Sequence, residues 1–133
     1  MKSSISDVLK ALQDSWSLES TEEPENWTQS NPSRGQCGIS ALIINDYFGG
    51  KLVLWKVFLG EDQVGFHYSN ELPDGTLFDS TGDQFWESEE LKEPSSFERP
   101  DKLPKNGADR YLDLSNLVRS KLESYRVGAK VST

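Results

Sequence analysis

The chain has 133 residues, and we expect residues 1–133 to form a single domain with one hydrophobic core. Its 35% hydrophobic and 27% charged residues fit a folded chain with a polar surface and argue against disorder. With 22 acidic against 14 basic residues the net charge is -8, which argues against nucleic acid and anionic membranes as partners, because both bind basic surfaces.

The residues near the N-terminus predict one helix and a long loop. Apolar side chains recur at helical spacing, and Ser4 can cap a helix over residues 4–15. Residues 17–34 carry prolines among polar side chains, and we expect them to form a loop that directs Trp16 and Trp27 inward. A loop of this length in a small domain is more often functional than a simple connection.

The middle of the chain predicts a buried helix followed by antiparallel strands. Residues 37–48 are apolar nearly all round a helix, which indicates burial, and Gly49 is a typical helix end. The segments 51–59 and 64–72 are expected to be strands, and a hairpin turn leads from the second of them into a third strand over residues 76–79.

The last third of the chain predicts a surface segment and a final helix over about residues 109–125. Residues 80–104 are polar and interrupted by prolines, and we expect them to wrap the surface. Three isolated aromatic residues are expected to pin this segment: Phe85, Trp86 and Phe97. The pattern indicates an α+β fold with its core in residues 34–82, in which a buried helix packs on a small antiparallel sheet and helices lie at both chain ends.

Cys37 is the only cysteine, and it opens the predicted buried helix. One cysteine cannot form an internal disulfide, and the sequence shows neither a signal-peptide pattern nor an apolar run of membrane-spanning length. We therefore expect a cytoplasmic protein with a reduced thiol. The positive end of the helix dipole favours a thiolate at this position, and Gly35 and Gly38 leave room for a substrate.

The only histidine, His67, and Asp79 fall on either side of a tight turn. The sequence Leu-Pro-Asp-Gly-Thr at residues 72–76 suits a three-residue loop with Gly in the left-handed position. Such a turn pairs Asn70 with Phe78 and places His67 and Asp79 on one face as diagonal neighbours. A two-residue Asp-Gly loop would point Asp79 to the other face.

A thiol, an imidazole and a carboxylate are the parts of a thiol nucleophile system. Each residue also has a simpler structural interpretation, as a small buried hydrophobe, a satisfied strand histidine or a turn former. A zinc site built from the same residues lacks a clear fourth ligand. Their order along the chain and their predicted geometry favour a site made of Cys37, His67 and Asp79.

The motifs around these residues resemble those of the transglutaminase-like branch of the papain-like cysteine hydrolase superfamily. The corresponding stretches are Gly-Gln-Cys-Gly-Ile-Ser-Ala at 35–41, His-Tyr-Ser-Asn-Glu at 67–71 and Asp-Ser-Thr at 79–81. Ser69 stands where an aromatic residue is common in that branch, and Ser80 replaces a proline. The resemblance implies a papain/transglutaminase-like core and the cleavage or transfer of an amide.

The chain more closely resembles the YunG family of small bacterial proteins. The supporting stretches are Pro-Ser-Arg-Gly-Gln-Cys at 32–37, Asn-Asp-Tyr-Phe-Gly-Gly at 45–50, His-Tyr-Ser-Asn-Glu-Leu-Pro-Asp-Gly at 67–75 and Asp-Ser-Thr-Gly-Asp-Gln-Phe at 79–85. This resemblance spans most of the chain and implies no particular activity.

The residues and the superfamily resemblance together predict a cysteine-dependent amide hydrolase or acyl transferase. Cys37 would attack a carbonyl and form a thioester, His67 would move the proton, and Asp79 would orient His67. The backbone N–H of Cys37 and one side chain would bind the oxyanion. Three side chains are candidates for this oxyanion or substrate role: Gln36, Gln29 and Trp27.

Two other interpretations stay open at this point. One is a non-catalytic binding or interaction module on the same fold, which the small size of the chain favours. The other is a small stress- or toxin-related factor that acts by contact with a protein partner. For the enzyme we expect a peptide, amide or small-molecule substrate, and neither a cofactor nor a metal.

Overall fold

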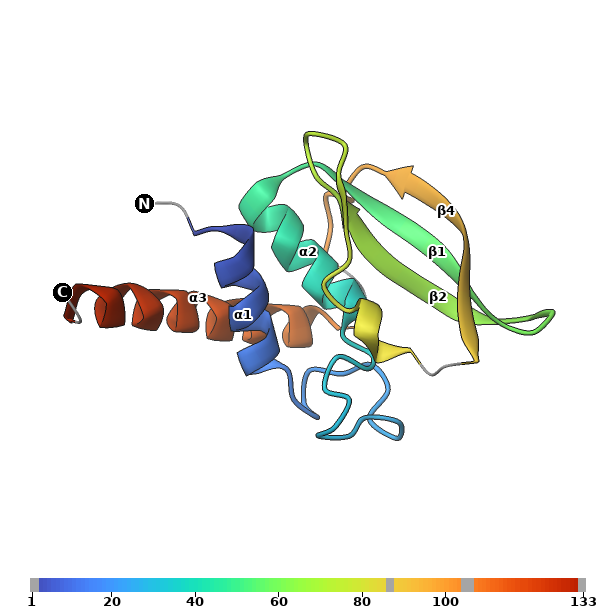
Figure 1. Ribbon diagram of the computed structural model, residues 1–133, viewed down its shortest axis with the longest axis horizontal. Helices are drawn as coiled ribbons and strands as arrows, with labels where there is room; N and C mark the ends of the chain where they lie inside the picture. The colour runs from blue at the N-terminus through green and yellow to red at the C-terminus, as the bar shows by residue number, and fades with distance from the viewer. Residues whose placement is uncertain (1–2, 86–87, 104–106, 132–133) are drawn as a thin grey trace.

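One helix lies at the centre of the fold, with the sheet on one side and the other two helices on the other side. The computed structural model describes residues 3–85, 88–103 and 107–131, and over these residues the chain has three α-helices, a four-stranded antiparallel sheet and one short 3-10 helix. In Figure 1, α2 (Cys37–Phe48) lies between the sheet and the other two helices, and it contacts both. The predicted α+β class is confirmed.

The first helix, α1 (Ile5–Ser15), begins at a capping box. The Ser4 hydroxyl accepts a hydrogen bond from the Asp7 amide, and the Asp7 carboxylate accepts one from the Ser4 amide. The apolar face of the helix is buried against α2 and α3. Trp16 ends the helix and is buried as predicted, and its indole Nε1 donates to Ser40 Oγ of α2 at 2.9 Å. This bond connects the first two helices.

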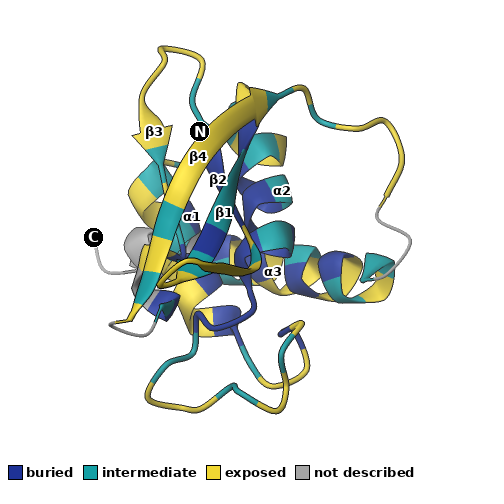
Figure 2. Ribbon diagram, turned by 90° about the vertical axis from the view of Figure 1, so that its right-hand side faces the viewer, coloured by how far each residue is buried: buried dark blue, intermediate teal, exposed yellow. Residues whose placement is uncertain are grey.

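The central helix α2 is buried because apolar side chains surround most of it (Figure 2). Ile39, Ile43 and Ile44 pack with side chains of α1 and α3 in the main core. The helix ends at Gly49, whose φ of 75° is a conformation that glycine adopts without strain. The structure therefore confirms the predicted buried helix and its start at Cys37.

Three strands follow in the predicted order. β1 (Lys51–Leu59) and β2 (Asp62–Glu71) are the two central strands, and β3 (Leu77–Phe78) extends the sheet on the β2 side. All neighbouring strands pair antiparallel.

The turn between β2 and β3 has the predicted type. The Leu72 amide donates to the Thr76 carbonyl at 2.8 Å, and Gly75 has a φ of 88°. Asn70 lies opposite Phe78, which is the predicted register. The chain after β3 therefore returns along β2 with Asp79 on the side of His67.

The outer strand β4 (Glu89–Phe97) contradicts the prediction of an irregular surface segment over residues 80–104. It pairs with β1 and completes the strand order β3-β2-β1-β4. Most of its residues are exposed (Figure 2), because an edge strand needs no apolar alternation, and an edge also tolerates Pro94. Of the three expected pinning rings, Trp86 lies outside the described residues.

The last helix, α3 (Ala108–Val131), extends beyond the predicted range of 109–125. Leu114 and Val118 are fully buried and pack against α1 and α2. The apolar periodicity ends near Tyr125, whereas backbone hydrogen bonding continues without it, so the sequence pattern underestimated the length.

The segment before α2, residues 17–36, is a loop held by its own hydrogen bonds. The Thr21 hydroxyl donates to the Arg34 carbonyl at 2.6 Å, which closes the loop immediately before Cys37. Trp27 is only half-buried, and its indole donates to the Pro32 carbonyl at 3.0 Å. The prediction that Trp27 points into the core is therefore wrong, because its ring contributes to the loop instead.

Candidate functional site

Cys37 is the first residue of α2, and its thiol is free and 9% exposed. The chain turns into the helix at Gly35, whose φ is 76° and where a Cβ would lie 2.1 Å from the Thr21 hydroxyl. Only glycine fits this close approach. The turn places Cys37 at the positive end of the helix dipole, beside backbone N–H groups that have no partner within the helix.

His67 and Asp79 meet across the β2–β3 hairpin. Nε2 of the fully buried His67 lies 2.7 Å from Oδ2 of Asp79. The other carboxylate oxygen of Asp79 accepts a hydrogen bond from the Thr81 amide at 3.2 Å, which fixes the carboxylate plane. The diagonal pairing expected from the turn type is therefore present in the structure.

Cys37 completes this group of side chains. Burial alone would lower the pKa of His67, but hydrogen bonds to the Asp79 carboxylate and to Cys37, together with the negative charges of both groups, raise it from 6.5 to about 9. The Asp79 carboxylate lies against Nε2 of the ring. The structure thus brings together the three residues that the sequence singled out. An imidazole held between a carboxylate and a thiol can accept the thiol proton.

Gln84 is a fourth residue of the candidate site, and the sequence analysis did not predict it. It lies in the 3-10 helix η1 (Gly82–Gln84), and its Oε1 accepts a hydrogen bond from the Gly35 amide at 3.1 Å. This bond turns Nε2 toward Thr81 Oγ1 at 2.9 Å and toward Nδ1 of His67 at 3.3 Å. A donor beside Nδ1 favours the neutral tautomer in which Nε2–H donates to Asp79 and Nδ1 is the acceptor.

No periodicity marks a side chain in a short 3-10 turn. Two signals could have indicated Gln84: its closeness along the chain to Asp79 and its place in the stretch 79–85 that resembles the YunG family. The neighbouring Phe85 presents its ring to His67 nearly edge-on, with ring centroids 4.7 Å apart. This contact covers the imidazole and helps to keep it dry. Phe85 therefore holds its segment to the fold, as expected, and the residue that it packs against is His67 of the candidate site.

A cavity of about 310 Å³ opens onto Cys37. The loop before α2 forms part of its wall through Glu22, Glu23 and Asn26. The three candidate oxyanion or substrate residues do not line it. Gln36 is buried and donates to the Ser17 carbonyl at 3.1 Å, Gln29 is exposed, and Trp27 faces Pro32. The structure does not bring these three side chains to the thiol.

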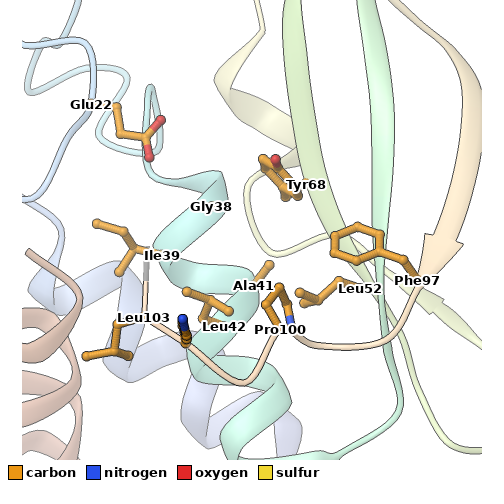
Figure 3. A pocket seen from close by; sticks show the side chains of 11 residues that line it. Glu22, Gly38, Ile39, Ala41, Leu42, Leu52, Tyr68, Phe97, Pro100 and Leu103 are labelled. Atoms are coloured by element: carbon orange, nitrogen blue, oxygen red, sulfur yellow. The ribbon is translucent and has the colours of Figure 1, made fainter. Parts of the chain in front are cut away.

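A second cavity of about 400 Å³ lies along α2 (Figure 3). Gly38, the residue after Cys37, lines it, and Glu22 lines both cavities. Most of its other lining residues are apolar and come from α2, from β1 and β2, and from the segment 97–103. The first two residues of α2 thus line one cavity each, Cys37 the first and Gly38 the second.

We expect His67, the single histidine, to titrate near pH 9 in heteronuclear NMR spectra. The fold favours the imidazolium, so the contribution of His67 to the free energy of unfolding is fully present below about pH 6.5 and is lost as the pH rises through about 9. Replacing Cys37 with Ala removes one negative partner and should lower the pKa of His67. A wild-type value at or below about 6.5 would contradict this arrangement.

Two further structural observations bear on binding. Among the described residues, no group of three or more histidine, cysteine, aspartate and glutamate side chains is arranged to hold a metal ion. Within the same part of the chain, no helix combines the length and apolar character that crossing a membrane requires.

Comparison with known proteins identifies one family. The family described as "YunG protein" matches residues 4–123. A protein of Bacillus subtilis (strain 168), described as "Uncharacterized protein YunG", is 38% identical over 74 residues, which are 56% of this chain and 56% of that protein. The alignment thus covers just over half of that relative, and no solved structure matches the chain. Because the family match spans most of its length, the chain belongs to the YunG family.

Proposed function

We propose that the chain is a cysteine-dependent amide hydrolase or acyl transferase in which Cys37 is the nucleophile, His67 the proton carrier and Asp79 the group that orients it. The observation that supports this most is the buried His67, whose Nε2 lies 2.7 Å from Asp79 while Cys37 lies close enough to the same ring to raise its pKa. The likeness of the surrounding motifs to transglutaminase-like and papain-like enzymes supports the same chemistry.

The proposed reaction has two steps. The Cys37 thiolate, whose proton His67 has taken, forms a bond to the substrate carbonyl carbon, and the negative charge on the carbonyl oxygen is held by backbone N–H groups at the start of α2. The carbon–nitrogen bond then breaks, and the amine leaves with the proton from His67. Water or a second amine attacks the thioester, gives its proton to His67 and releases an acid or a new amide.

The single cysteine makes the nucleophile directly measurable. We expect iodoacetamide to alkylate Cys37 of the folded chain faster at about pH 7 than the same thiol of the urea-unfolded chain, because His67 lies beside the sulfur and can take its proton. Intact mass spectrometry follows the modification across pH, with the urea-unfolded chain as the control. A folded chain that reacts no faster than the unfolded one would contradict the proposal.

A binding module is the second candidate function, and one observation favours it. The Gln84 amide lies against Nδ1 of His67, the nitrogen that a proton carrier must offer to the thiol, and Cys37 itself is largely covered. On this interpretation the folded chain resists alkylation at every pH at which it stays folded. The alkylation profile therefore separates the two functions.

A further inference from the structure

We propose that the cavity along α2 holds an unbranched acyl chain, so that the amide substrate of Cys37 is an N-acyl compound with a long hydrocarbon chain. This inference rests on the proposed function, since it assigns a substrate class to the same thiol. It is argued from the position, the lining and the entrance of the cavity.

The cavity starts one residue from the nucleophile. Gly38 and Ala41 of α2 form one wall, and Leu52 and Tyr68 of the sheet form the opposite wall, as Figure 3 shows. The chain segment 97–103 completes it. On this proposal, an acyl group attached to the Cys37 sulfur enters the space past the neighbouring Gly38.

The lining fits hydrocarbon better than peptide. Leucine, isoleucine, alanine, proline and phenylalanine side chains dominate, and two of the 11 lining residues, Glu22 and Lys102, are charged. A peptide occupant would leave its own N–H and C=O groups without partners in such a space, which is unfavourable, whereas methylene groups gain from leaving water. The volume of about 400 Å³ lies within the range of small-molecule sites, roughly 300–1,000 Å³.

The proposed entrance lies beside Gly38, which lines the cavity along α2, and Glu22, which lines both cavities. A Cβ on Gly38 would lie 3.4 Å from Oε1 of Glu22 and 3.8 Å from Cδ2 of Tyr68, so there is room for about one methyl group between Gly38 and these side chains. Such a space suits an unbranched chain better than a branched one. The Glu22 carboxylate at this point also disfavours an anionic group inside, so the apolar end of the substrate enters first.

The chemical step follows the proposed reaction. The Cys37 sulfur forms a bond to the acyl carbonyl carbon while the carbon–nitrogen bond breaks, and the amine leaves with the proton that His67 took from the thiol. Water then attacks the thioester, which releases the long-chain carboxylic acid and restores the thiol. The hydrocarbon chain occupies the cavity in both steps.

The test compares acylation of Cys37 by p-nitrophenyl acetate and p-nitrophenyl decanoate, followed by nitrophenolate release and by the mass of the acylated chain. We expect the decanoate to react at least about tenfold faster. Leu103→Glu should reduce the decanoate rate by about tenfold and leave the acetate rate unchanged, because Leu103 lines the cavity and its 46% exposure lets the fold accept a charge. Leu112→Glu is the matched control, since Leu112 is 47% exposed on α3 and does not line the cavity.

A second pair of variants tests the entrance. Gly38→Ala places a methyl group in the entrance at ordinary contact distances, in a helix that prefers alanine, so the chain should fold while the ratio of decanoate to acetate rates falls. Gly65→Ala adds the same methyl group in the Cys37 cavity, where a Cβ would meet nothing within 4 Å. It should leave the ratio unchanged.

The outcomes separate the two proposals. Equal acylation by both esters, with no effect of Leu103→Glu or Gly38→Ala, would overturn the acyl-chain inference and keep the nucleophile. If neither ester acylates Cys37, the proposed function fails. Calorimetric titration with sodium decanoate then tests separately whether the cavity along α2 binds an alkyl chain. Binding that Leu103→Glu weakens and Leu112→Glu does not would support an alkyl-chain site, and absence of binding would overturn it.

Discussion

Replacing Asp79 with Asn should lower the rate at which p-nitrophenyl acetate acylates Cys37 by about 10⁴-fold, the size of effect that loss of the carboxylate has in Ser-His-Asp hydrolases. In the proposed mechanism the carboxylate, 2.7 Å from Nε2 of His67, accepts a hydrogen bond from Nε2–H and so leaves Nδ1 to accept the thiol proton. An asparagine amide keeps Oδ1 for the Thr81 amide and presents Nδ2–H to Nε2. Because Nε2 must then act as the acceptor, the variant forces the tautomer of His67 in which Nδ1 carries the proton.

We expect Asp79→Asn to lower the acylation rate without lowering the stability of the fold. Asp79 is partly exposed, so the variant should stay folded and unfold in urea near the wild-type midpoint. The opposite tautomer also sets Nδ1–H against the Gln84 amide donor, which adds to the misorientation of the ring. If the variant is acylated within about tenfold of the wild type, Asp79 serves only the hairpin and the role assigned to it is wrong.

Most of the candidate site was predictable because it depends on local rules. The apolar run after the turn at Gly35 predicts that a helix begins at Cys37. The relative position of His67 and Asp79 depends only on the type of the turn at residues 72–76. The sequence favours the three-residue loop over a two-residue Asp-Gly loop, and the structure has Gly75 in the left-handed conformation that the three-residue loop needs. Each of these steps involves residues close together in the sequence, where pattern and structure are tightly connected.

The missed elements depend on long-range contacts instead. β4 is an edge strand whose polar residues pair with β1 about forty positions earlier, and pairing of that kind leaves no periodic pattern in the strand itself. Gln84 reaches His67 only because its other amide atom bonds to Gly35, 49 residues away. Sequence spacing carries no sign of such a bond.

The prediction of Gln36, Gln29 and Trp27 as oxyanion side chains rests only on their closeness in sequence to Cys37. Gln36 donates its side-chain amide to the Ser17 carbonyl, a partly buried acceptor in the loop before α2, and not to the site of the thiol. Trp27 likewise satisfies a carbonyl within its loop. Backbone hydrogen bonding within the loop thus determined where both side chains point, and that could not be read from residue types.

A buried ion pair connects the loop before α2 to the sheet. Arg34, with its side chain 7% exposed, donates from both terminal nitrogens to the two oxygens of Glu89, at 2.6 and 3.3 Å, and the Glu89 side chain is 4% exposed. A second carboxylate, Glu23 of the loop, lies 3.3 Å from the same guanidinium. The pair joins the segment immediately before Cys37 to the start of β4.

Replacing Arg34 with Ala should therefore lower the free energy of unfolding by about 3–5 kcal/mol, because it leaves the Glu89 carboxylate buried without the guanidinium. Arg34→Lys keeps the charge but not the two-pronged bond, and its loss should be smaller. Lys56→Ala is the matched control: it breaks an exposed pair with Glu93 at 3.2 Å and should cost less than about 1 kcal/mol. Urea unfolding followed by tryptophan fluorescence measures all three variants. If Arg34→Ala costs no more than Lys56→Ala, the ion pair does not hold the loop, and the position of Cys37 must depend on hydrogen bonds such as those of Thr21 and Gln84.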